Sequence, residues 1–453
     1  MTIDFIDRGD ELRRLRALSR LKSPPFVVLV GRRRVGKTRL VQEFAKSIRD
    51  PLYLFVEEKR AEILLREWSG RAGSGTLFTS WEPLVRHFLS RHPVVVIDEF
   101  QNFARVDPSF FTTLQKILDE EMHSSMLILV GSYVGMMRKI FEDRGSPLFG
   151  RATEIWNIPP LPMADVLANI KGDFSTRMAV YSMFGGYPKY YSMLEQYGTR
   201  EVEDIWAKLV IPKYSPLSME PHNILLQEFG GEHRAYFSIL EAIALGKRTY
   251  TEISDYTGLS TTTLGRYMSD LSSFEIVERR FPITEGAGSK KSRYGIKDEF
   301  IRFWFRYIFP RMDLREAERY DEILDLIKSD FPSFVSFKFE EVARELVSRD
   351  YGKTGAWWDR RGEEIDIVSV DEKRRDILFG EVKWKDRPAG WNVVEELRRK
   401  SGLVQWGMGR RKERHLVVSR AGFTRQCLER MDAEGVLHWD IRDVERMIRK
   451  SRG

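Results

Sequence analysis

The sequence predicts a multidomain α/β protein, on the strength of three observations. A β-branched run over residues 26–30 ends in a glycine-rich loop, and apolar residues at helical spacing follow it. A second apolar run, over 94–97, ends in two adjacent carboxylates. Helical patterns and paired strand patterns then occupy 235–310 and 334–385. Together they predict a P-loop parallel α/β sheet core, further helices, a winged helix-turn-helix and a C-terminal α/β domain of nuclease type.

The composition is that of a folded globular protein. With 453 residues, the chain is long enough for about three domains. Hydrophobic residues make up 42% and charged residues 31%, which excludes wholesale disorder. The net charge of +7 permits nucleic-acid binding, but a solvated basic surface explains it equally well. No apolar run is long enough for a membrane span and the N-terminus is too charged for a secretory signal, so we expect a cytoplasmic protein.

Cysteine and histidine usage restricts the metals that this chain could bind. Cys427 is the single cysteine, so neither an intrachain disulfide nor a cysteine-based zinc site can form. The seven histidines show no H-x-x-x-H pairing. Any catalytic metal is therefore expected to be a hard ion held by oxygen, such as Mg²⁺.

The loop after the first strand fits the P-loop pattern G-x-x-x-x-G-K-[ST]. Its glycines let the backbone curl so that successive N–H groups point at phosphate oxygens. Lys37 would reach the β- and γ-phosphates, and the Thr38 hydroxyl would coordinate Mg²⁺. The positive end of the following helix adds to the attraction. The residues expected to contact the nucleotide are Gly31, Arg32, Arg33, Arg34, Val35, Gly36, Lys37, Thr38 and Arg39.

The second apolar run, in PVVVIDEFQ, predicts a central parallel strand with Asp98 and Glu99 at its C-terminal tip. Ligands bind at that edge of an α/β sheet. Following a P-loop, this is a Walker B element, in which Asp98 would hold Mg²⁺ through water and Glu99 would act as the general base. The alternative is a strand that ends in a solvated turn.

Two further residues could contact the γ-phosphate. The run 126–132 is an apolar strand that ends in Ser132, which could sense the γ-phosphate or equally cap the next helix. Arg151 follows the Pro/Gly turn SPLFGR and could reach a γ-phosphate in the same chain or in a neighbouring subunit. The alternative for Arg151 is an ordinary surface arginine.

Residues 235–310 predict three helices followed by a β-hairpin, the order of a winged helix-turn-helix. The recognition helix is expected over about 260–274, and Lys290, Lys291 and Arg293 would lie on the wing against phosphates. Such folds also serve as protein–protein adaptors. The exposed residues expected at the start of the recognition helix are Thr261, Thr262, Thr263, Arg266 and Tyr267.

The C-terminal part contains the arrangement Asp…Glu-x-Lys on two adjacent strands. Asp366 lies on a strand over 362–368, and strand periodicity places Glu381 and Lys383 on one face of the next. In two-carboxylate nucleases the acids hold Mg²⁺ and the lysine steadies the developing charge. Glu340, on the preceding helix, could add a further carboxylate ligand. Whether such a domain cleaves DNA is a separate matter.

Taken together, these motifs resemble the archaeal-type P-loop ATPases of the AAA+/STAND group that carry a C-terminal restriction-endonuclease-like domain. The matching stretches are FIDRGDEL, GRRRVGKT, VVVIDEFQ, LILVGS, SPLFGR, the G-G-x-P turn before residue 188, and WWD…GEEIDIV…ILFGEVKW. The resemblance implies an ATP-driven switch with a helical lid, in which Pro188 would sense the nucleotide. The expected domains are the ATPase core (1–162), the lid (163–228), the winged helix (229–310) and connector helices with the nuclease-like domain (311–453).

Two functions remain open from the sequence. In the first, an Mg²⁺-dependent ATPase associates with DNA and carries an active nuclease domain. In the second, a signalling or scaffold ATPase uses an inactive nuclease-like domain to bind DNA or protein. We expect ATP and Mg²⁺ as cofactors, DNA as a partner, no membrane, and a chain that could form a homo-oligomer.

Overall fold

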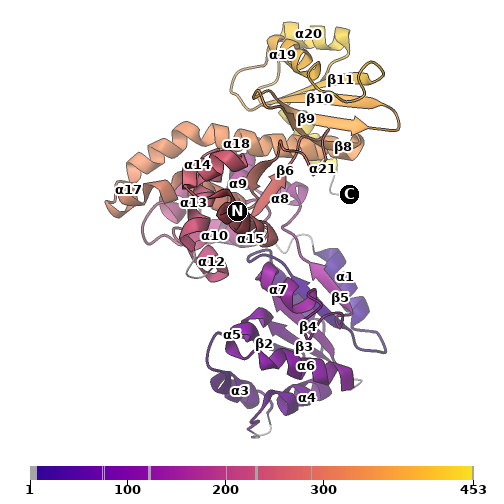
Figure 1. Cartoon of the computed structure of the whole chain (residues 1–453), viewed down its shortest axis with the longest axis vertical. Coiled ribbons are helices and arrows are strands. Elements are labelled where there is room, and N and C mark those ends of the chain that lie inside the picture. The colour runs from indigo at the N-terminus through magenta and orange to yellow at the C-terminus, as the bar shows by residue number, and fades with distance from the viewer. Residues whose placement is uncertain are drawn as a thin grey trace. The chain divides into compact units, whose positions relative to one another are not determined.

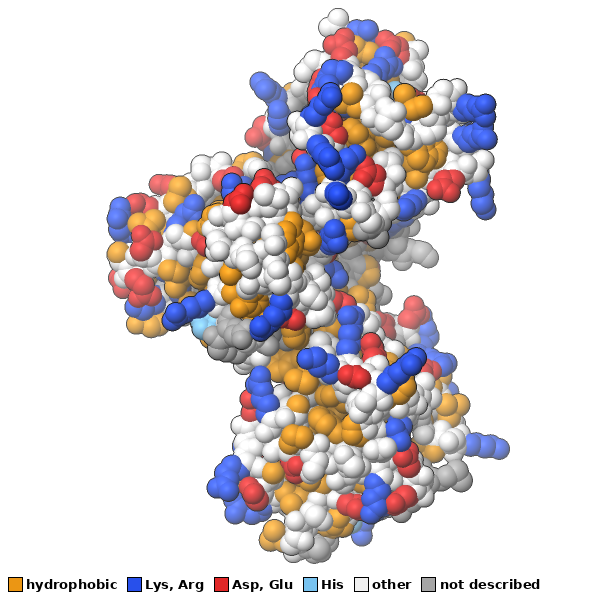
Figure 2. Space-filling view, viewed as in Figure 1, with side chains coloured by type: hydrophobic (Ala, Val, Ile, Leu, Met, Phe, Trp, Pro, Cys, Tyr) orange, Lys and Arg blue, Asp and Glu red, His pale blue; other side chains and the backbone are white. Residues whose placement is uncertain are grey.

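The computed structural model describes residues 8–73, 75, 77–120, 124–199, 201–229, 233–286 and 288–450 (Figure 1). The chain forms two compact units. Of the described residues, the first unit contains residues 8–161 together with Tyr187–Ser192, and the second contains Pro162–Gly186 and everything from Met193 onward. Among the described helices, none is both long and apolar enough to cross a membrane. Basic and acidic side chains are interspersed on the face shown in Figure 2.

The first unit is built on a five-stranded sheet in the order β2-β3-β4-β1-β5, with every pair parallel. This confirms the predicted parallel α/β core, and β4 lies between the strands that carry the two Walker elements. The strands are β1 (Phe26–Val30), β2 (Leu52–Phe55), β3 (Val94–Asp98), β4 (Met126–Gly131) and β5 (Glu154–Asn157). The helices are α1 (Gly9–Leu18), α2 (Lys37–Ala45), α3 (Ala61–Gly70), α4 (Trp81–Arg91), α5 (Phe103–Val106), α6 (Ser109–Glu120) and α7 (Val134–Phe141).

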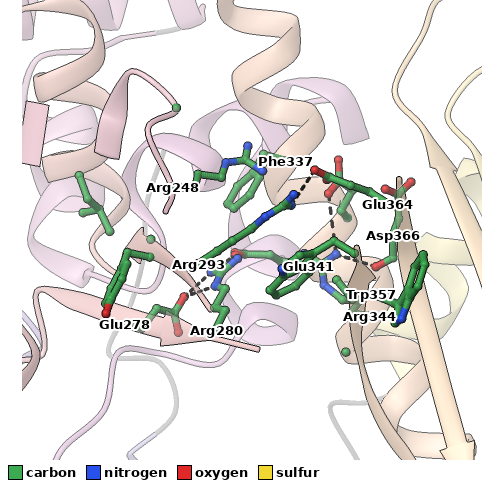
Figure 3. Close-up of a pocket in the computed structure, with 18 of the residues that line it drawn as sticks. Arg248, Glu278, Arg280, Arg293, Phe337, Glu341, Arg344, Trp357, Glu364 and Asp366 are labelled. Atoms are coloured by element: carbon green, nitrogen blue, oxygen red, sulfur yellow. Dashed lines mark hydrogen bonds and ion pairs between the residues drawn. The ribbon is translucent and has the colours of Figure 1, made fainter. Parts of the chain in front are cut away.

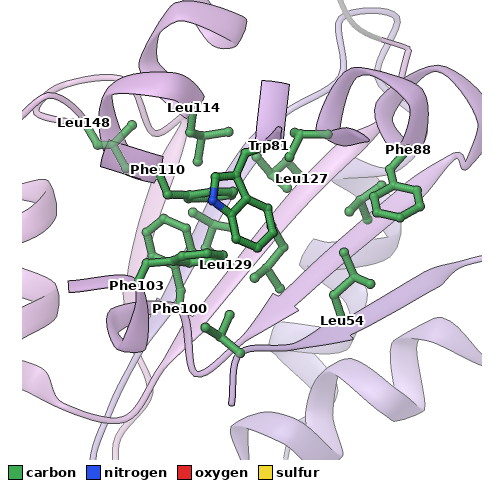
Figure 4. Close-up of a cluster of buried hydrophobic side chains, with 14 of the residues drawn as sticks. Leu54, Trp81, Phe88, Phe100, Phe103, Phe110, Leu114, Leu127, Leu129 and Leu148 are labelled. Carbon is green, nitrogen blue, oxygen red and sulfur yellow. The ribbon is translucent and has the colours of Figure 1, made fainter. Parts of the chain in front are cut away.

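The buried core of the first unit includes an aromatic cluster that contains Trp81, Phe100, Phe103 and Phe110 (Figure 4). Phe103 and Phe110 stack with ring centroids 3.7 Å apart, and the indole of Trp81 meets Phe103 edge-on at 5.4 Å. Phe100, fully buried, joins the cluster directly after the Walker B carboxylates. Aromatic pairs of this kind are worth about 0.5–1.5 kcal/mol beyond their burial. The cluster therefore fixes the backbone that presents Asp98 and Glu99.

The second unit begins with a helical part and a winged-helix element order. Its first helices are α8 (Met163–Asn169), α9 (Phe174–Phe184), α10 (Pro188–Gln196, which starts in the first unit), α11 (Val202–Ile205), the π-helical turn η2 (Trp206–Val210) and α12 (Glu220–Phe229). The region predicted to form a winged helix contains α13 (His233–Ala244), α14 (Tyr250–Thr257), α15 (Thr261–Ser273), β6 (Val277–Arg280) and β7 (Arg293–Ile296). A Thr249–Glu252 capping box starts α14, and the Ser260 side chain caps α15. Thr and Ser at these positions are typical helix N-caps.

A series of helices, of which the last is the longest, connects the predicted winged-helix region to the C-terminal sheet. They are α16 (Glu299–Tyr307), the 3₁₀ turn η4 (Phe309–Arg311), α17 (Met312–Glu316) and α18 (Tyr320–Asp350), which contains Pro332. The sheet has the order β12-β11-β10-β9-β8, antiparallel from β8 to β10 and parallel from β10 to β12. Its elements are β8 (Lys353–Trp358), β9 (Glu364–Asp371), β10 (Asp376–Lys383), α19 (Asn392–Ser401), β11 (Lys412–Ser419), α20 (Arg425–Glu434), β12 (Leu437–Trp439) and α21 (Ile441–Lys450).

The β6–β7 wing packs onto this sheet. The Ile283 N–H donates to the Ala356 carbonyl (2.9 Å), and the Trp358 indole donates to the Lys291 carbonyl (2.7 Å). Arg293 pairs with Glu364 (2.6 Å). The sequence predicts that the wing faces phosphates. In the structure the Lys291 side chain instead pairs with Glu285 and the Arg293 side chain pairs with Glu364.

Candidate functional site

The P-loop follows a path that only glycine allows at two positions. Gly36 caps α2 in the left-handed region, with φ at 92°. At Gly31, a Cβ atom would lie 2.5 Å from the backbone oxygen of Ile158, and the backbone cannot yield to it. Glycine avoids both penalties. The loop is thereby held in the curl that the phosphate-binding hypothesis requires.

Two P-loop side chains point into the site at the C-terminal edge of the sheet. The Lys37 ammonium, almost fully buried, donates to the carbonyls of Gly31 (2.6 Å) and Arg32 (3.0 Å). The Thr38 hydroxyl donates to Asp98 Oδ2 at 2.8 Å. The structure therefore brings together the residues predicted from the two Walker motifs, which lie 60 positions apart.

Asp98 is buried at the tip of β3 and both of its oxygens accept hydrogen bonds. Oδ1 accepts from the Glu99 N–H at 2.8 Å. Oδ2 accepts from Thr38 and also from the hydroxyl of Tyr53, on β2. Burial, followed by the charge of Asp98, raises the pKa of Tyr53, so its hydroxyl stays protonated and remains a donor.

Glu99 has an unusual backbone conformation and a constrained side chain. Its φ of 53° lies in the left-handed region, where the chain turns sharply from β3 into a 3₁₀ turn. Its carboxylate accepts from the Ser132 hydroxyl at 2.6 Å and from the side-chain amide of Gln101. Ser132 therefore lies beside the predicted general base, at the end of the neighbouring strand β4.

The three consecutive P-loop arginines each lie against a tyrosine. One of these tyrosines, Tyr133, follows β4. The other two lie in the segment Tyr187–Ser192, which belongs to the same compact unit. The pairs are Arg32 with Tyr187 (hydrogen bond, 3.1 Å), Arg33 with Tyr133 (2.7 Å) and Arg34 over the ring of Tyr190 (5.1 Å). Cation–π contacts of this kind are worth about 0.5–2 kcal/mol. The basic triplet is thus tied to the segment that carries Pro188.

The remaining predicted nucleotide contacts lie around the loop. Pro188 Cγ is 3.8 Å from the point where a Gly36 Cβ would stand, so it borders the loop directly. Val35 is buried and its carbonyl accepts from Arg8 (3.2 Å). Arg39 is exposed on α2.

Arg151 is not brought to the P-loop. It forms two 2.8 Å hydrogen bonds to the carboxylate of Asp119 on α6. It also precedes Thr153, whose N–H donates to Phe26 at the amino end of β1, whereas the P-loop leaves the carboxyl end. Within this chain Arg151 lies at the opposite edge of the sheet, and a contact with a neighbour's nucleotide stays a prediction.

The residues at this edge fit a magnesium–nucleotide complex. A curled loop with a left-handed glycine, a buried lysine and a helix N-terminus suits a polyphosphate. The hydroxyl of Thr38 and the carboxylate of Asp98 are hard oxygen donors, the class that Mg²⁺ prefers. Thr38 and Asp98 would hold the ion, and Lys37 would pair with phosphate oxygens.

The C-terminal candidates lie together but face two different cavities. Asp366 Oδ2 accepts from the N–H of Val382 (2.8 Å), and the Lys383 ammonium pairs with Glu381 Oε1 (2.6 Å). Glu381 and Lys383 line a cavity of about 380 Å³. Asp366 and Glu340 line a separate cavity of about 570 Å³, which we call the wing cavity because the β6–β7 wing forms one wall.

Charges within the group of Asp366, Glu381, Glu340 and Lys383 influence the pKa values of three of its members. Burial, and then the Glu381 charge, raises the pKa of Asp366. Burial, and then Asp366, raises the pKa of Glu340. For Lys383, burial opposes the charged form, but the attraction and hydrogen bond of Glu381 outweigh it and raise the pKa. In the described part of the chain, no group of three or more His, Cys, Asp or Glu side chains is placed to hold a metal ion.

Sequence reasoning missed several residues at the P-loop site. Gln101 lies in the Walker B stretch PVVVIDEFQ, two positions after Glu99. That short spacing could have indicated that Gln101 contacts Glu99. Tyr53 alternates with the buried Leu52 and Leu54, which marks it as facing another direction, but nothing local connects it with Asp98. Arg8 reaches the loop from a position distant in sequence.

The family models match two separate parts of the chain. A family described as "AAA domain" matches residues 23–167, and the DUF234 family, described as "Archaea bacterial proteins of unknown function", matches 304–398. The ORC2 protein of Aeropyrum pernix, solved with ADPNP and ADP, has a TM-score of 0.45 at 14% identity over 72% of this chain and 95% of its own. AMPPCP-bound DnaA from Aquifex aeolicus has a TM-score of 0.33 at 14% identity over 60% and 89%. These two likenesses are too distant to bear on function.

A relative matches nearly the full length. An uncharacterized protein of Methanocaldococcus jannaschii is 33% identical over 420 residues, which cover 88% of this chain and 92% of that protein. The similarity extends over most of both chains. The chain therefore belongs to the family of archaeal-type P-loop ATPases in which an AAA domain precedes a C-terminal DUF234 domain.

Proposed function

We propose that this protein binds ATP with Mg²⁺, hydrolyses it and uses the cycle as a conformational switch. The observation that carries the proposal is the 2.8 Å hydrogen bond from Thr38 to Asp98, with Glu99 beside it at the same sheet edge. A hydroxyl, a metal-binding carboxylate and a second carboxylate form the set that phosphoryl transfer to water requires. The match to an AAA domain over 23–167 supports the same function.

In this proposal each residue has a defined task. Lys37 exchanges its two carbonyl partners for phosphate oxygens, and the loop N–H groups neutralise further charge. Bound Mg²⁺ would neutralise phosphate charge and orient the phosphoryl group. Glu99 accepts the proton of the attacking water, and Ser132, its hydrogen-bond donor, holds the carboxylate in place. Pro188, Tyr187 and Tyr190 lie against the P-loop, so a change in the loop on nucleotide binding would move the start of α10 and, through it, the lid.

ATP binding and turnover by two variants test the proposal. Lys37→Ala removes the phosphate cation, so nucleotide binding should be lost in equilibrium titration. Glu99→Gln keeps the shape but cannot accept a proton, so ATP should bind while turnover falls about 10²–10⁴-fold. Lys46→Ala and Glu62→Gln, exposed on α2's end and α3, are matched controls and should behave as wild type. Normal turnover by Glu99→Gln would remove Glu99 from its role.

A second candidate concerns the C-terminal domain, and the split between its cavities favours it. Glu381 is engaged by Lys383 and lines a different cavity from Asp366 and Glu340. We propose that this domain binds a ligand or partner without cutting DNA, which makes the protein a scaffold or signalling ATPase. Supercoiled plasmid incubated with Mg²⁺ or Mn²⁺ should stay intact. Nicking that disappears in Glu381→Ala and Lys383→Ala, while ATP turnover survives, would instead establish the nuclease.

A further inference from the structure

The wing cavity has the size of a small-molecule site. Its volume of about 570 Å³ falls within the range of about 300–1,000 Å³ typical of ligand pockets. Its walls come from the β6–β7 wing, α16, α18 and the β8–β9 pair (Figure 3). All of these elements belong to the same compact unit. The cavity has no role in the ATPase cycle proposed above.

Three arginines surround one phenylalanine ring in this cavity. The guanidinium carbons of Arg248, Arg280 and Arg302 lie 5.4, 5.3 and 4.7 Å from the centroid of Phe337. Like charges so close together repel one another in a partly desolvated site. They require nearby negative charge to balance them.

The carboxylates of the cavity do not balance all three arginines. Arg280 pairs with Glu278 and Glu341. By contrast, Nε and Nη2 of Arg302 are buried without a hydrogen-bond partner in the described part of the chain. The Arg248 guanidinium likewise makes no hydrogen bond or ion pair to any described residue. Burial lowers the pKa of both arginines, and each gains only longer-range attraction from carboxylates.

These unmatched donors favour an anion with several acceptor oxygens. A planar guanidinium fork suits phosphate better than it suits a single acceptor. Arg248 and Arg302 both line the cavity, with their guanidinium carbons 5.4 and 4.7 Å from the centroid of the same ring. A bare phosphate would leave most of the volume empty. The remaining wall includes apolar side chains such as Phe281, Ile283 and Trp357, and the acceptors Glu340 and Asp366. A ligand that fits all three features carries a phosphate, a flat ring and hydroxyl or amino donors.

We propose that the wing cavity binds a nucleotide, with its phosphate on Arg248 and Arg302 and its ring and hydroxyl groups toward the apolar wall and the Glu340–Asp366 pair. The nucleotide is either free or the 5′-phosphorylated end of a single nucleic-acid strand. Both sources present the same chemistry to the cavity. The site does not depend on the P-loop, so either proposal can fail without the other.

Calorimetric titration of full-length Lys37→Ala protein, in which the P-loop is silenced, tests this inference. The probes are the four nucleoside 5′-monophosphates, adenosine without phosphate and a 5′-phosphorylated trithymidylate. We expect at least one phosphorylated probe to bind and adenosine to bind at least tenfold more weakly. Binding of monophosphates indicates a free nucleotide, whereas binding of the trinucleotide alone indicates a strand end.

Second-site variants in the same background identify the cavity. Arg248→Gln, at a half-buried position without ion pairs, should weaken binding at least tenfold while circular dichroism remains unchanged. Arg302→Gln should also weaken binding at least tenfold. If the Arg302 variant fails to fold because Nε and Nη2 of Arg302 are buried, the Arg248 variant alone decides the test. Arg430→Gln is the matched control, because Arg430 lies 4.0 Å over the ring of Trp391 but outside the cavity. The inference is overturned if no phosphorylated probe binds, or if Arg248→Gln binds as tightly as its parent.

Discussion

Single residues at the tip of β3 determine what the ATPase site can do. Asp98 accepts hydrogen bonds from three donors: the N–H of Glu99, the hydroxyl of Thr38 on α2 and the hydroxyl of Tyr53 on β2. A carboxylate with all of these partners cannot rotate freely, so it is pre-organised for a metal ion. Glu99, one residue further, is held by a different pair of donors. Adjacent acids can therefore serve as metal ligand and proton acceptor without exchanging roles.

Gly31 provides a sharp test of the loop geometry. Gly31→Ala places a Cβ against the Ile158 carbonyl, at 2.5 Å from its oxygen, and the sheet must shift to accept it. We expect the free energy of unfolding to fall by about 1–3 kcal/mol and ATP affinity to drop with it. Chemical denaturation and nucleotide titration measure the two effects.

The control for this substitution is Gly70→Ala, at the end of α3. A Cβ atom there meets nothing within 4 Å. Alanine is the better helix former by about 0.5–1 kcal/mol, so this variant should be as stable as wild type or slightly more stable. Equal destabilisation by both substitutions would contradict the close approach at Gly31.

Residue-level prediction from sequence succeeded where chemistry and spacing are local. The motif residues Lys37, Thr38, Asp98 and Glu99 are brought together in the structure, and their roles stay predictions. Tyr53 was missed because its contact with Asp98 depends on which strand neighbours β3, a fact that no local pattern contains. The partners of the C-terminal acids were missed for the same reason.

At the scale of elements, α16 and α18 are joined by a polar contact at the edge of their interface. Arg306 on α16 donates to both oxygens of Asp330 on α18, at 2.6 and 2.8 Å, and the Tyr307 hydroxyl donates at 2.7 Å. Burial raises the pKa of Asp330, but these donors outweigh it and lower the pKa below the ordinary value of 3.8. The contact therefore favours the ionised carboxylate.

The stability of this contact should depend on pH. Because the folded-state pKa is depressed, its contribution is complete above about pH 4 and is lost as the pH falls through the folded value. Asp330→Asn should lower the free energy of unfolding by about 1–2 kcal/mol at pH 7, a figure reduced for partial exposure, and the difference from wild type should shrink at pH 3. Asp325→Asn, exposed on the same helix, should show little effect at either pH. Urea denaturation at both pH values measures this, and a difference independent of pH would count against it.

Elements with strong periodicity were predictable, whereas sheet membership was not. The strands β1, β3 and β4 are apolar runs followed by Gly31, Asp98 and Gly131, respectively, and they are found where the sequence predicts them. The hairpin of β9 and β10 was also expected. The residue patterns of β8, β11 and β12 did not identify these segments as strands. β11 begins with four charged or polar residues, Lys412–His415, and becomes apolar only in its second half. Its pairing with β10 overrides that weak local signal.

At the scale of the whole molecule, the question is whether DNA is a partner. The start of α15 exposes Thr261, Thr262 and Thr263, and Arg266 is exposed one turn later. The wing contributes less than expected, because Arg293 is paired with Glu364. Basic side chains on the face in Figure 2 are mixed with acidic ones. Any DNA contact is therefore expected to centre on α15.

Duplex DNA should accelerate ATP turnover if this contact exists. We expect the stimulation to decline steeply between about 50 and 200 mM salt, because phosphate contacts release counterions. Arg266→Ala should reduce the stimulation severalfold, and Arg234→Ala, exposed on α13, should not. Turnover that is identical with and without DNA at low salt would favour a protein partner for the winged helix.

The helix α18 links the helical part to the C-terminal sheet within a single element. Its 31 residues span about 46 Å at the usual rise. One end buries Ile323 and Ile327, and the other carries Glu340 and Arg344 beside β9. Pro332, between them, has no N–H to donate, so the helix lacks one backbone hydrogen bond there. Because one continuous helix spans both ends, a tilt of its amino end would be carried to its carboxyl end, where it would move Glu340 relative to Asp366 on β9.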